Sequence, residues 1–406
     1  MIKSLFKHST IYFSGLFVSK LLTTIVWILI ARLFAPVIFG QVVLYLTFIQ
    51  LATYFANFGL NQWYQKQIEH HQYQRGLLLN KILNARLITL FLSLIILGFF
   101  LFFTKSFSLS ASIFTLLTLI PDSFLAIGEG YYLEQKKGLR VALKSASMAV
   151  VIFIALPFIK QPFLFEKITV ANLLAELVTV LWFYPWFEFK NFCFVSFKQS
   201  LQVLRSSINY ALLIFTSFFY ARGDHLVINY SLGAKALGLY GAAYRYLEAL
   251  SLIPTALSHN LFPISAKKQG VSRDSLVHIV GLMVVSGLII SIFLFFLSNF
   301  LVIKLIGPAY GEVIQPLKIF SVVLFLFFVN APLSTVVQSS NYLKSFLPYG
   351  IINTVLNIIL NLVLVTRYGI VSAAWVMLIT EVTGLLINYY FIKKIYCISI
   401  GVTPLS

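Results

Sequence analysis

The sequence predicts an all-α polytopic membrane protein with about twelve transmembrane helices, arranged as two six-helix lobes related by a parallel repeat. Three observations carry this prediction. The composition is 60% hydrophobic and only 10% charged, with a mean hydropathy of +0.92, whereas soluble domains are near half apolar and a quarter charged. Apolar stretches long enough to cross a bilayer recur along the whole chain. Two hairpins that lie 198 positions apart also resemble each other.

The charge balance excludes two other classes of protein. The 30 Lys and Arg residues outnumber the 12 Asp and Glu residues, for a formal net charge of +18. A disordered chain would be poor in apolar residues, which this one is not. A nucleic-acid-binding protein carries its basic patch on a soluble surface, so we expect no nucleic-acid partner.

The first half of the chain contains six apolar stretches that we interpret as spans: 10–31, 38–60, 82–103, 109–128, 141–159 and 168–187. The first follows Lys3 and Lys7 in the way that a signal peptide would. However, its apolar run is roughly 20 residues long, which is too long for a signal peptide and long enough for a span. Lys20 interrupts the run, and Arg32 follows where a small-residue cleavage site would lie. The sequence therefore predicts a first transmembrane helix here.

The second half contains six more such stretches: 208–230, 237–262, 279–303, 314–338, 346–365 and 370–392. The connections between all twelve stretches are too short to hold a folded extramembrane domain. We therefore predict an N-terminal lobe over residues 1–200, with helices 1–6, and a C-terminal lobe over 201–406, with helices 7–12.

The basic residues predict the orientation. On the side opposite the N-terminus, the connections and span ends hold only eight basic residues: Arg32, Lys105, Lys160, Lys167, Lys235, Lys304, Lys318 and Arg367. Lys20, Arg86, Arg222 and Arg245 lie deeper within spans, and the other 18 Lys and Arg residues are in connections or at span ends on the N-terminal side. The positive-inside rule then places both termini in the cytoplasm. Trp182, Tyr184 and Trp186 fit an aromatic belt at the cytoplasmic end of the sixth span.

The similar hairpins run from Phe34 to Tyr45 and from Leu232 to Ala243. In each, a short turn enters a helix through a glycine, Gly40 or Gly238, and aromatic and small residues follow. The offset maps the first span onto the seventh and the second onto the eighth. Six spans per half is an even number, so both halves share one topology and the repeat is parallel. Transporters built in this way hold their substrate between two lobes and rock them alternately.

We find no sequence pattern for catalysis, a metal site or a cofactor. Cys193 and Cys397 are the only cysteines, and neither belongs to a CxxC or Cys/His spacing. The chain contains no GxSxG, HExxH or phosphate-loop glycine pattern. We therefore expect neither an enzyme nor a cofactor-binding protein.

Ionisable residues inside spans are costly and usually have a function. The sharpest cluster lies at similar depth on the seventh and eighth spans and comprises Arg222, Asp224, His225, Tyr240, Tyr244, Arg245 and Glu248. Two interpretations stay open. The arginines can grip phosphate groups in a bidentate fork while the tyrosines stack on sugar rings. Alternatively, the charged residues only pair with one another and clamp the two helices together.

The remaining charges within spans divide into cations and acids. We interpret Lys20, in the middle of the first span, as a cavity cation. Arg86 is a second cavity candidate, although its place near a span end favours snorkelling to the headgroups. The acids Glu381, Glu176, Asp122, Asp224 and Glu248 are candidate ion-coupling groups, because a carboxyl group can gain and lose a proton as its access to water changes. Hydrogen bonding to neighbouring polar side chains is the alternative role for the deepest of them, Glu381 and Glu176.

Several motifs resemble those of a known family. They are residues 31–36 with Phe39-Gly40, residues 56–60, Arg222-Gly-Asp224, Leu232-Gly233, residues 237–240, Ala243-Tyr244-Arg245, Phe262-Pro263, residues 307–310, residues 353–357 and Tyr368-Gly369. Together they resemble the polysaccharide-transporter branch, which includes the O-antigen (Wzx-type) flippases, of the multidrug/oligosaccharidyl-lipid/polysaccharide (MOP) exporter superfamily. The resemblance covers about residues 10–394. Phe34-Ala35-Pro36 departs from the more usual leucine-glycine-proline of this branch.

The resemblance implies a flippase of lipopolysaccharide or related polysaccharide biosynthesis in the bacterial inner membrane. Its substrate would be an undecaprenyl-diphosphate-linked oligosaccharide, moved from the cytoplasmic to the periplasmic leaflet by alternating access. It implies a proton or sodium gradient as the energy source, and membrane lipids and the polysaccharide polymerase machinery as partners. The alternative within the superfamily is an exporter of drugs or of a peptidoglycan lipid precursor. A membrane polymerase or ligase is disfavoured, because the outer connections are too short to carry catalytic residues.

Overall fold

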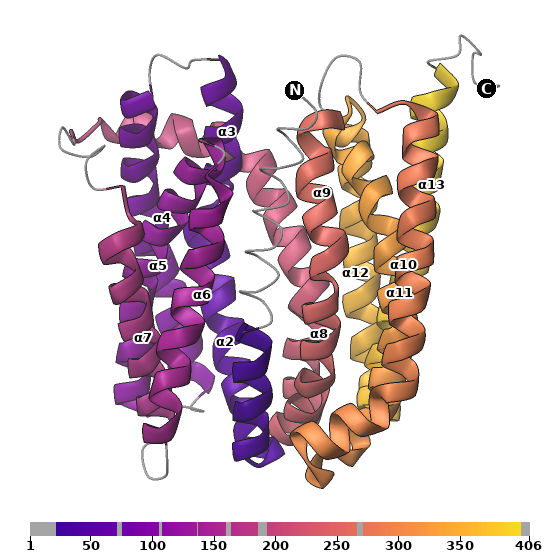
Figure 1. Cartoon of the computed structure of the whole chain (residues 1–406). Coiled ribbons are helices and arrows are strands. Elements are labelled where there is room, and N and C mark those ends of the chain that lie inside the picture. The colour runs from indigo at the N-terminus through magenta and orange to yellow at the C-terminus, as the bar shows by residue number, and fades with distance from the viewer. Residues whose placement is uncertain are drawn as a thin grey trace. The chain divides into compact units, whose positions relative to one another are not determined.

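The computed structural model describes residues 22–70, 75–104, 108–135, 137–159, 164–185, 193–265 and 271–398. Every regular element in these ranges is helical (Figure 1). The chain forms two compact units. Unit 1 comprises residues 1–26 and 45–218, and unit 2 comprises residues 27–44 and 219–406. The predicted division into lobes at residue 200 stays a prediction.

Unit 1 is a bundle of helices around an aromatic core. Its elements are α2 (Pro36–Asn57), of which the first part belongs to unit 2, α3 (Leu60–His70), α4 (Arg75–Thr104), α5 (Leu109–Glu134), α6 (Gly138–Ala155), the 3₁₀ turn η2 (Leu156–Phe158), α7 (Leu164–Phe183) and the start of α8 (Phe197–Leu250). Helix α5 packs against α4, α6 and α7. Tyr64, Tyr132 and Phe183 are fully buried at one end of the bundle, together with Leu79 and Leu125.

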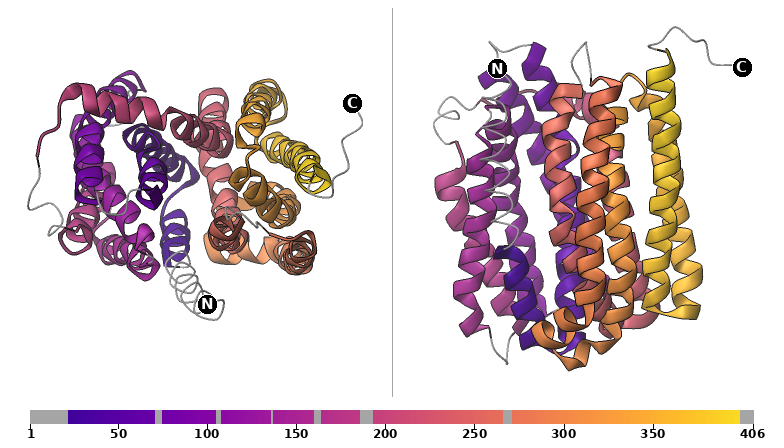
Figure 2. Two further views of the ribbon diagram at one scale, coloured as in Figure 1. Left: turned by 90° about the horizontal axis from the view of Figure 1, so that it is seen from above. Right: turned by 45° about the vertical axis from the view of Figure 1, so that its right-hand side comes forward.

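Unit 2 is built around α11 (Ile314–Ser339), which packs against four other helices. These are α9 (Leu252–Ser265), α10 (Arg273–Phe300), α12 (Leu343–Tyr368) and α13 (Ile370–Ile398). A short π-helix η4 (Leu301–Ile306) and the 3₁₀ segment η5 (Pro308–Val313) join α10 to α11. Within each unit the long helices stand side by side, as the end-on view in Figure 2 shows.

The predicted spans fall on helices throughout the described residues. Within the described ranges, eight helices are long and apolar enough to cross a membrane. One of them, α8, has 54 residues and contains both the seventh and most of the eighth predicted span. The fifth and sixth predicted spans correspond to α6 and α7. Only the end of the first span is described, as the apolar helix Leu22–Leu33. The predicted all-helical membrane fold is therefore confirmed.

One predicted connection is wrong in detail. The sequence suggested a loop between residues 230 and 237, but helical structure continues through this segment. Only Gly233 leaves the helical conformation, with φ 80° and ψ −179°. Glycine has no Cβ and adopts a positive φ at little cost, so one residue suffices to reverse the chain.

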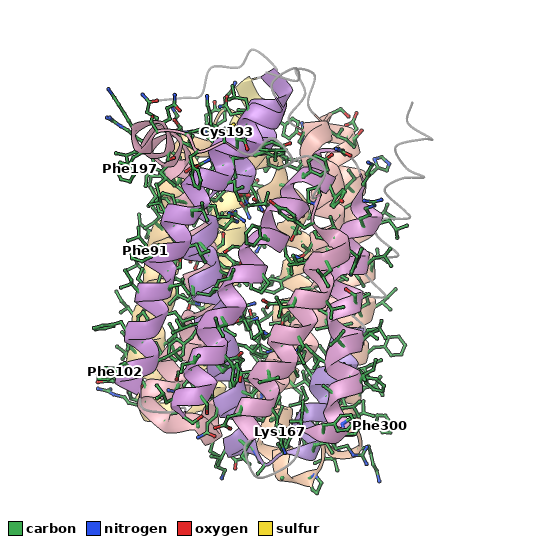
Figure 3. All side chains as sticks on the ribbon, turned by 90° about the vertical axis from the view of Figure 1, so that its left-hand side faces the viewer. Phe91, Phe102, Lys167, Cys193, Phe197 and Phe300 are labelled. Atoms are coloured by element: carbon green, nitrogen blue, oxygen red, sulfur yellow. The ribbon has the colours of Figure 1, made fainter. Side chains whose placement is uncertain are left out.

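The outer surface of the helices suits a lipid environment. Large apolar side chains are exposed along the spans, among them Phe102 at 76% and Phe296 at 77%. Phe91 and Phe102 project from the side of unit 1 in Figure 3. In water such a continuous apolar surface would drive aggregation, whereas in a bilayer it is the expected surface.

The predicted repeat explains a close contact inside unit 2. A Cβ atom added at Gly40 would collide with the carbonyl oxygen of Ala234, and one at Gly238 would collide with the carbonyl oxygen of Pro36. Ala234 is the repeat equivalent of Pro36, and Gly238 is that of Gly40. The contact is thus reciprocal, as expected for a pair of segments that face each other across a two-fold axis.

Candidate functional site

The two parts of α8 bring the predicted charged cluster together. The chain reverses at Gly233, so residues before it lie beside residues after it. Tyr244 donates a hydrogen bond to the carbonyl oxygen of Ala221, at 3.0 Å. Tyr240 donates one to Asp224 Oδ2, at 2.5 Å. Residues before and after Gly233 therefore meet in unit 2.

Two arginines share one carboxylate in this cluster. Arg222 Nη2 lies 3.2 Å from Glu248 Oε1, and Arg245 Nη1 lies 2.9 Å from Glu248 Oε2. The three side chains are mostly buried, with relative exposures of 9%, 14% and 21% for Arg222, Arg245 and Glu248. The trio by itself has a formal net charge of +1, and Asp224 of the same cluster supplies a second negative charge. Both predicted interpretations are compatible with this geometry, because the ion pairs exist and both guanidinium groups converge on one carboxylate.

An aromatic ring also packs against each of the two guanidinium groups. Arg222 Cζ lies 4.8 Å from the centroid of the Tyr244 ring, and Arg245 Cζ lies 4.7 Å from that of Trp27. Ring faces attract cations, and they do so more strongly away from water. The rings therefore compensate part of the cost of burying two guanidinium groups side by side.

The other acid of the cluster has separate partners. Asp224 Oδ1 lies 2.7 Å from His225 Nδ1, and Oδ2 accepts the hydrogen bond from Tyr240. The Tyr240 ring is fully buried and packs edge-on against Phe320 and His225. Tyr240 therefore presents no open face in this structure on which a sugar ring could stack, which corrects that part of the expectation. His225 Nε2 lies 3.3 Å from Arg222 Nη1, so the two halves of the cluster touch.

Glu381 forms a second polar cluster in unit 2. Tyr220 donates a hydrogen bond to Glu381 Oε1, and Asn330 Nδ2 donates one to Oε2 at 2.9 Å. Glu381 is buried, and no basic side chain of the described residues forms an ion pair with it. The deep lone acid predicted from the sequence is thus held by neutral donors from α8 and α11.

Sequence reasoning missed the amide side chains that continue this cluster. Asn353 and Asn357 of α12 donate to the backbone oxygen and the hydroxyl of Thr380, at 3.0 and 3.1 Å. The amide oxygens of Asn353, Asn361 and Asn388 are buried and have no hydrogen-bond partner within the described residues. Asn353, Asn357 and Asn361 are spaced by four residues, so they share one helix face. That spacing was the signal that could have revealed this polar face.

Unit 1 contains its own buried charges. Arg86 is buried and donates hydrogen bonds to Asn57 Oδ1 at 2.6 Å, Asn61 Oδ1 at 3.1 Å and the Ser123 carbonyl oxygen at 3.0 Å. The expectation that Arg86 snorkels to the headgroups is therefore wrong, because neutral oxygens inside the bundle hold it.

Two acids of unit 1 also have neutral polar partners inside the bundle. Asp122 accepts a hydrogen bond from Thr53 at 2.7 Å, and Glu176 is buried beside Asn172 at 3.4 Å. Lys144, at the start of the fifth span, and Glu129, just after the fourth, form an ion pair at 2.8 Å. Lys20 lies outside the described residues. No group of three or more His, Cys, Asp or Glu side chains that could hold a metal ion occurs in the described part of the chain.

Comparisons with known proteins agree with this architecture. A family model described as "Polysaccharide biosynthesis protein" matches residues 5–269. An uncharacterized membrane protein of Methanocaldococcus jannaschii, MJ1375, is 26% identical over 206 residues, which is 48% of this chain and 47% of that protein. The chain thus matches about half the length of this relative.

Solved structures share the fold across nearly the whole chain. An inward-facing multidrug resistance MATE family transporter of the MOP superfamily aligns with a TM-score of 0.71 at 14% identity, over 97% of this chain and 100% of that one. The lipid II flippase MurJ, in an inward closed conformation, aligns with a TM-score of 0.66 at 14% identity, over 94% and 87% of the two chains. A point mutant of the Vibrio cholerae MATE transporter VcmN gives 0.64 at 13% identity, over 97% of each chain.

Proposed function

The chain belongs to the polysaccharide biosynthesis protein family and has the fold of the MOP superfamily, and from these premises we propose that it is a flippase for a lipid-linked oligosaccharide. The substrate is an undecaprenyl-diphosphate-linked repeat unit of O-antigen or a similar polysaccharide. The protein carries it from the cytoplasmic to the periplasmic leaflet of the bacterial inner membrane by alternating access. Both termini lie in the cytoplasm, and the polymerase machinery takes up the product.

The observation that carries this proposal is the pair of arginines that share Glu248. A diphosphate offers several oxygens to two guanidinium groups, each of which can donate two parallel hydrogen bonds. Without substrate, Glu248 supplies the counter-charge. With substrate, the diphosphate replaces the carboxylate as the ligand of one arginine, while Tyr244 and Trp27 keep both guanidinium planes in place. Arg86 and Lys20 are further candidates for contact with the substrate.

Glu381 supports coupling to a proton or sodium ion. A buried carboxylate without a basic partner gains stability when it takes up a proton or a cation. The hydrogen bonds from Tyr220 and Asn330 hold its two oxygens in a fixed position, and unpaired amide oxygens lie in the same polar cluster. Glu176 and Asp122 in unit 1, and Asp224 and Glu248 beside the arginines, are the other coupling candidates.

Reconstituted vesicles test the substrate-binding role. We expect Arg222→Gln and Arg245→Gln to abolish flipping of a fluorescent undecaprenyl-diphosphate glycolipid, without loss of protein from the vesicles. Arg367→Gln, at the exposed end of α12, is the matched control and should transport normally. Full transport by both cluster variants would overturn the assignment. Rescue by the charge swap Arg245→Glu with Glu248→Arg would instead favour a purely structural ion pair.

The alternative is export of drugs or of a peptidoglycan lipid precursor, because solved structures of both kinds of transporter share the fold. The same vesicles decide between these substrates. Transport of a cationic dye, or of a lipid-linked peptidoglycan precursor in preference to the lipid-linked glycan, would favour the alternative.

A further inference from the structure

The first turns of α8 have three distinct faces. Helical spacing places Ser200, Val203, Leu204, Ser207 and Ala211 along one stripe, and all five are buried. A second stripe consists of Phe197, Leu201, Ile208 and Leu212, all of which are exposed. The third consists of polar side chains, namely Lys198, Gln199, Gln202, Arg205, Ser206 and Asn209. A helix with only protein on one side and water on the other needs two faces, so the exposed apolar stripe requires a further environment.

The buried stripe attaches this segment firmly to unit 1. Val203 and Leu204 belong to the core cluster that contains Leu78, Leu79 and Tyr132. A Cβ atom added at Gly59 would lie 2.6 Å from the Ala211 nitrogen, so the two backbones are in close contact. Upstream of the helix, Asn84 Nδ2 donates a hydrogen bond to the Cys193 carbonyl oxygen at 3.1 Å. The orientation of the other two faces is therefore fixed by packing.

The exposed apolar stripe is unusually open. Phe197 is 68% exposed and Leu201 is 53% exposed, and Phe194, just before the helix, is 81% exposed. This part of α8 runs across the ends of the upright helices of unit 1 (Figure 1). In Figure 3, Cys193 and Phe197 lie at one end of the unit and Lys167 lies at the other. The stripe thus lies at the level where the spans end, which is where a bilayer surface would be.

The polar face has the charge that such a surface attracts. Residues 193–212 include Lys198 and Arg205 but no acidic residue. Neither basic side chain forms an ion pair within the described residues. By angular position along the helix, both lie next to the apolar stripe, at the boundary between acyl chains and headgroups. Helices with this arrangement lie in the membrane interface.

We propose that residues 197–207, which precede the seventh span, form an interfacial helix that binds anionic phospholipids: Phe197 and Leu201 insert at the acyl boundary, while Lys198 and Arg205 bind headgroup phosphates. The helix anchors the connection between the sixth and seventh spans to the bilayer surface. This assignment rests on the faces of the helix and does not depend on which substrate the protein carries.

Lipid binding tests the charge part of the proposal. The probe is phosphatidylglycerol, compared with phosphatidylcholine, bound to the purified full-length protein and measured by native mass spectrometry. We expect Lys198→Gln with Arg205→Gln to weaken phosphatidylglycerol binding by about fivefold for each charge removed and to leave phosphatidylcholine binding unchanged. Lys167→Gln, at the opposite end of unit 1, is the matched control. Equal loss in the control, or no loss in the double variant, would overturn the role of Lys198 and Arg205.

Depth measurements test the apolar part independently. Spin labels are placed at Leu201→Cys or at Ser206→Cys, in a chain that also carries Cys193→Ser and Cys397→Ser, in phosphatidylglycerol-containing vesicles. We expect the label at 201 to be relaxed by oxygen, which concentrates in lipid, and the label at 206 by a water-soluble nickel chelate. Nickel accessibility at both positions would overturn the proposal. So would a label at 201 shielded from both reagents, because that result indicates a covering protein surface.

Discussion

At the scale of single residues, the feature with the clearest consequences is that Arg222 and Arg245 both pair with Glu248. The sequence predicted that Arg222, Arg245 and Glu248 lie at one depth, because their distances from the span ends can be counted. It did not predict that one carboxylate serves both arginines, since that depends on side-chain directions on both sides of the reversal at Gly233. Lys144 and Glu129 show the same limit: their ion pair was not predicted, because each residue was judged alone.

Because two arginines depend on one carboxylate, we expect Glu248→Gln and Arg245→Gln to differ in stability. Glu248→Gln leaves two buried arginines without their common counter-charge, whereas Arg245→Gln leaves a one-to-one pair between Arg222 and Glu248. Removing one member of a buried ion pair costs about 3–5 kcal/mol, and the partial exposure of Glu248 reduces this figure. We therefore expect the unfolding temperature in detergent to fall clearly for Glu248→Gln and much less for Arg245→Gln. Equal falls would show that the two arginines do not depend on one carboxylate.

A substitution at Glu381 can separate the effect of its negative charge from the effect of its side-chain shape. Glu381→Gln keeps the size of the side chain: its amide oxygen can accept the hydrogen bond from Asn330, and its amide nitrogen can donate one to the Tyr220 hydroxyl oxygen. It cannot bind a proton or offer a negative charge to sodium. We expect normal unfolding temperature, together with loss of the stimulation of flipping by a proton or sodium gradient. Glu312→Gln, at an exposed position in η5, should keep that stimulation. Undiminished gradient dependence in Glu381→Gln would remove this residue from coupling.

At the scale of elements, sequence periodicity and length located the helices, but glycines decided how closely they pack. The weak similarity of two hairpins becomes physically meaningful at Gly40 and Gly238, where backbone meets backbone and no Cβ fits. The joining of two predicted spans within α8 could not be predicted, because the conformation of Gly233 follows from tertiary packing of the flanking helices rather than from local preference.

The close contact at Gly40 and Gly238 predicts that even a glycine-to-alanine substitution lowers the stability of the protein. Gly40→Ala and Gly238→Ala each place a methyl group against a backbone carbonyl, so helices must separate, at a cost of about 1–3 kcal/mol or more. Gly350→Ala is the matched control, since this helical glycine has open space around its Cβ position and alanine favours helix by about 0.5–1 kcal/mol. We expect lower unfolding temperatures for the first two variants and an unchanged or higher one for the control. If all three behave alike, the close contact does not exist in the membrane.

At the scale of the whole molecule, composition and hydropathy were sufficient for the fold class, because the bilayer demands helices of a set length with internally satisfied backbones. The grouping of residues 27–44 with the C-terminal helices could not be predicted, since neighbouring spans in sequence need not belong to one compact unit. Loop charges are a third kind of information: they predict which side of the membrane each connection faces and depend on no contact at all.

The native Cys193 provides a test of that orientation. It is exposed at one end of unit 1, opposite to Lys167 (Figure 3). If both termini are cytoplasmic, then Cys193 faces the cytoplasm, because it follows an even number of spans. In a Cys397→Ser chain, a membrane-impermeant maleimide should label Cys193 in inside-out vesicles and leave it unmodified in right-side-out vesicles. A chain with Cys193→Ser, Cys397→Ser and Lys167→Cys should show the reverse pattern. Labelling of Cys193 from the outside would invert the topology, and with it the direction of transport assigned to the arginine site.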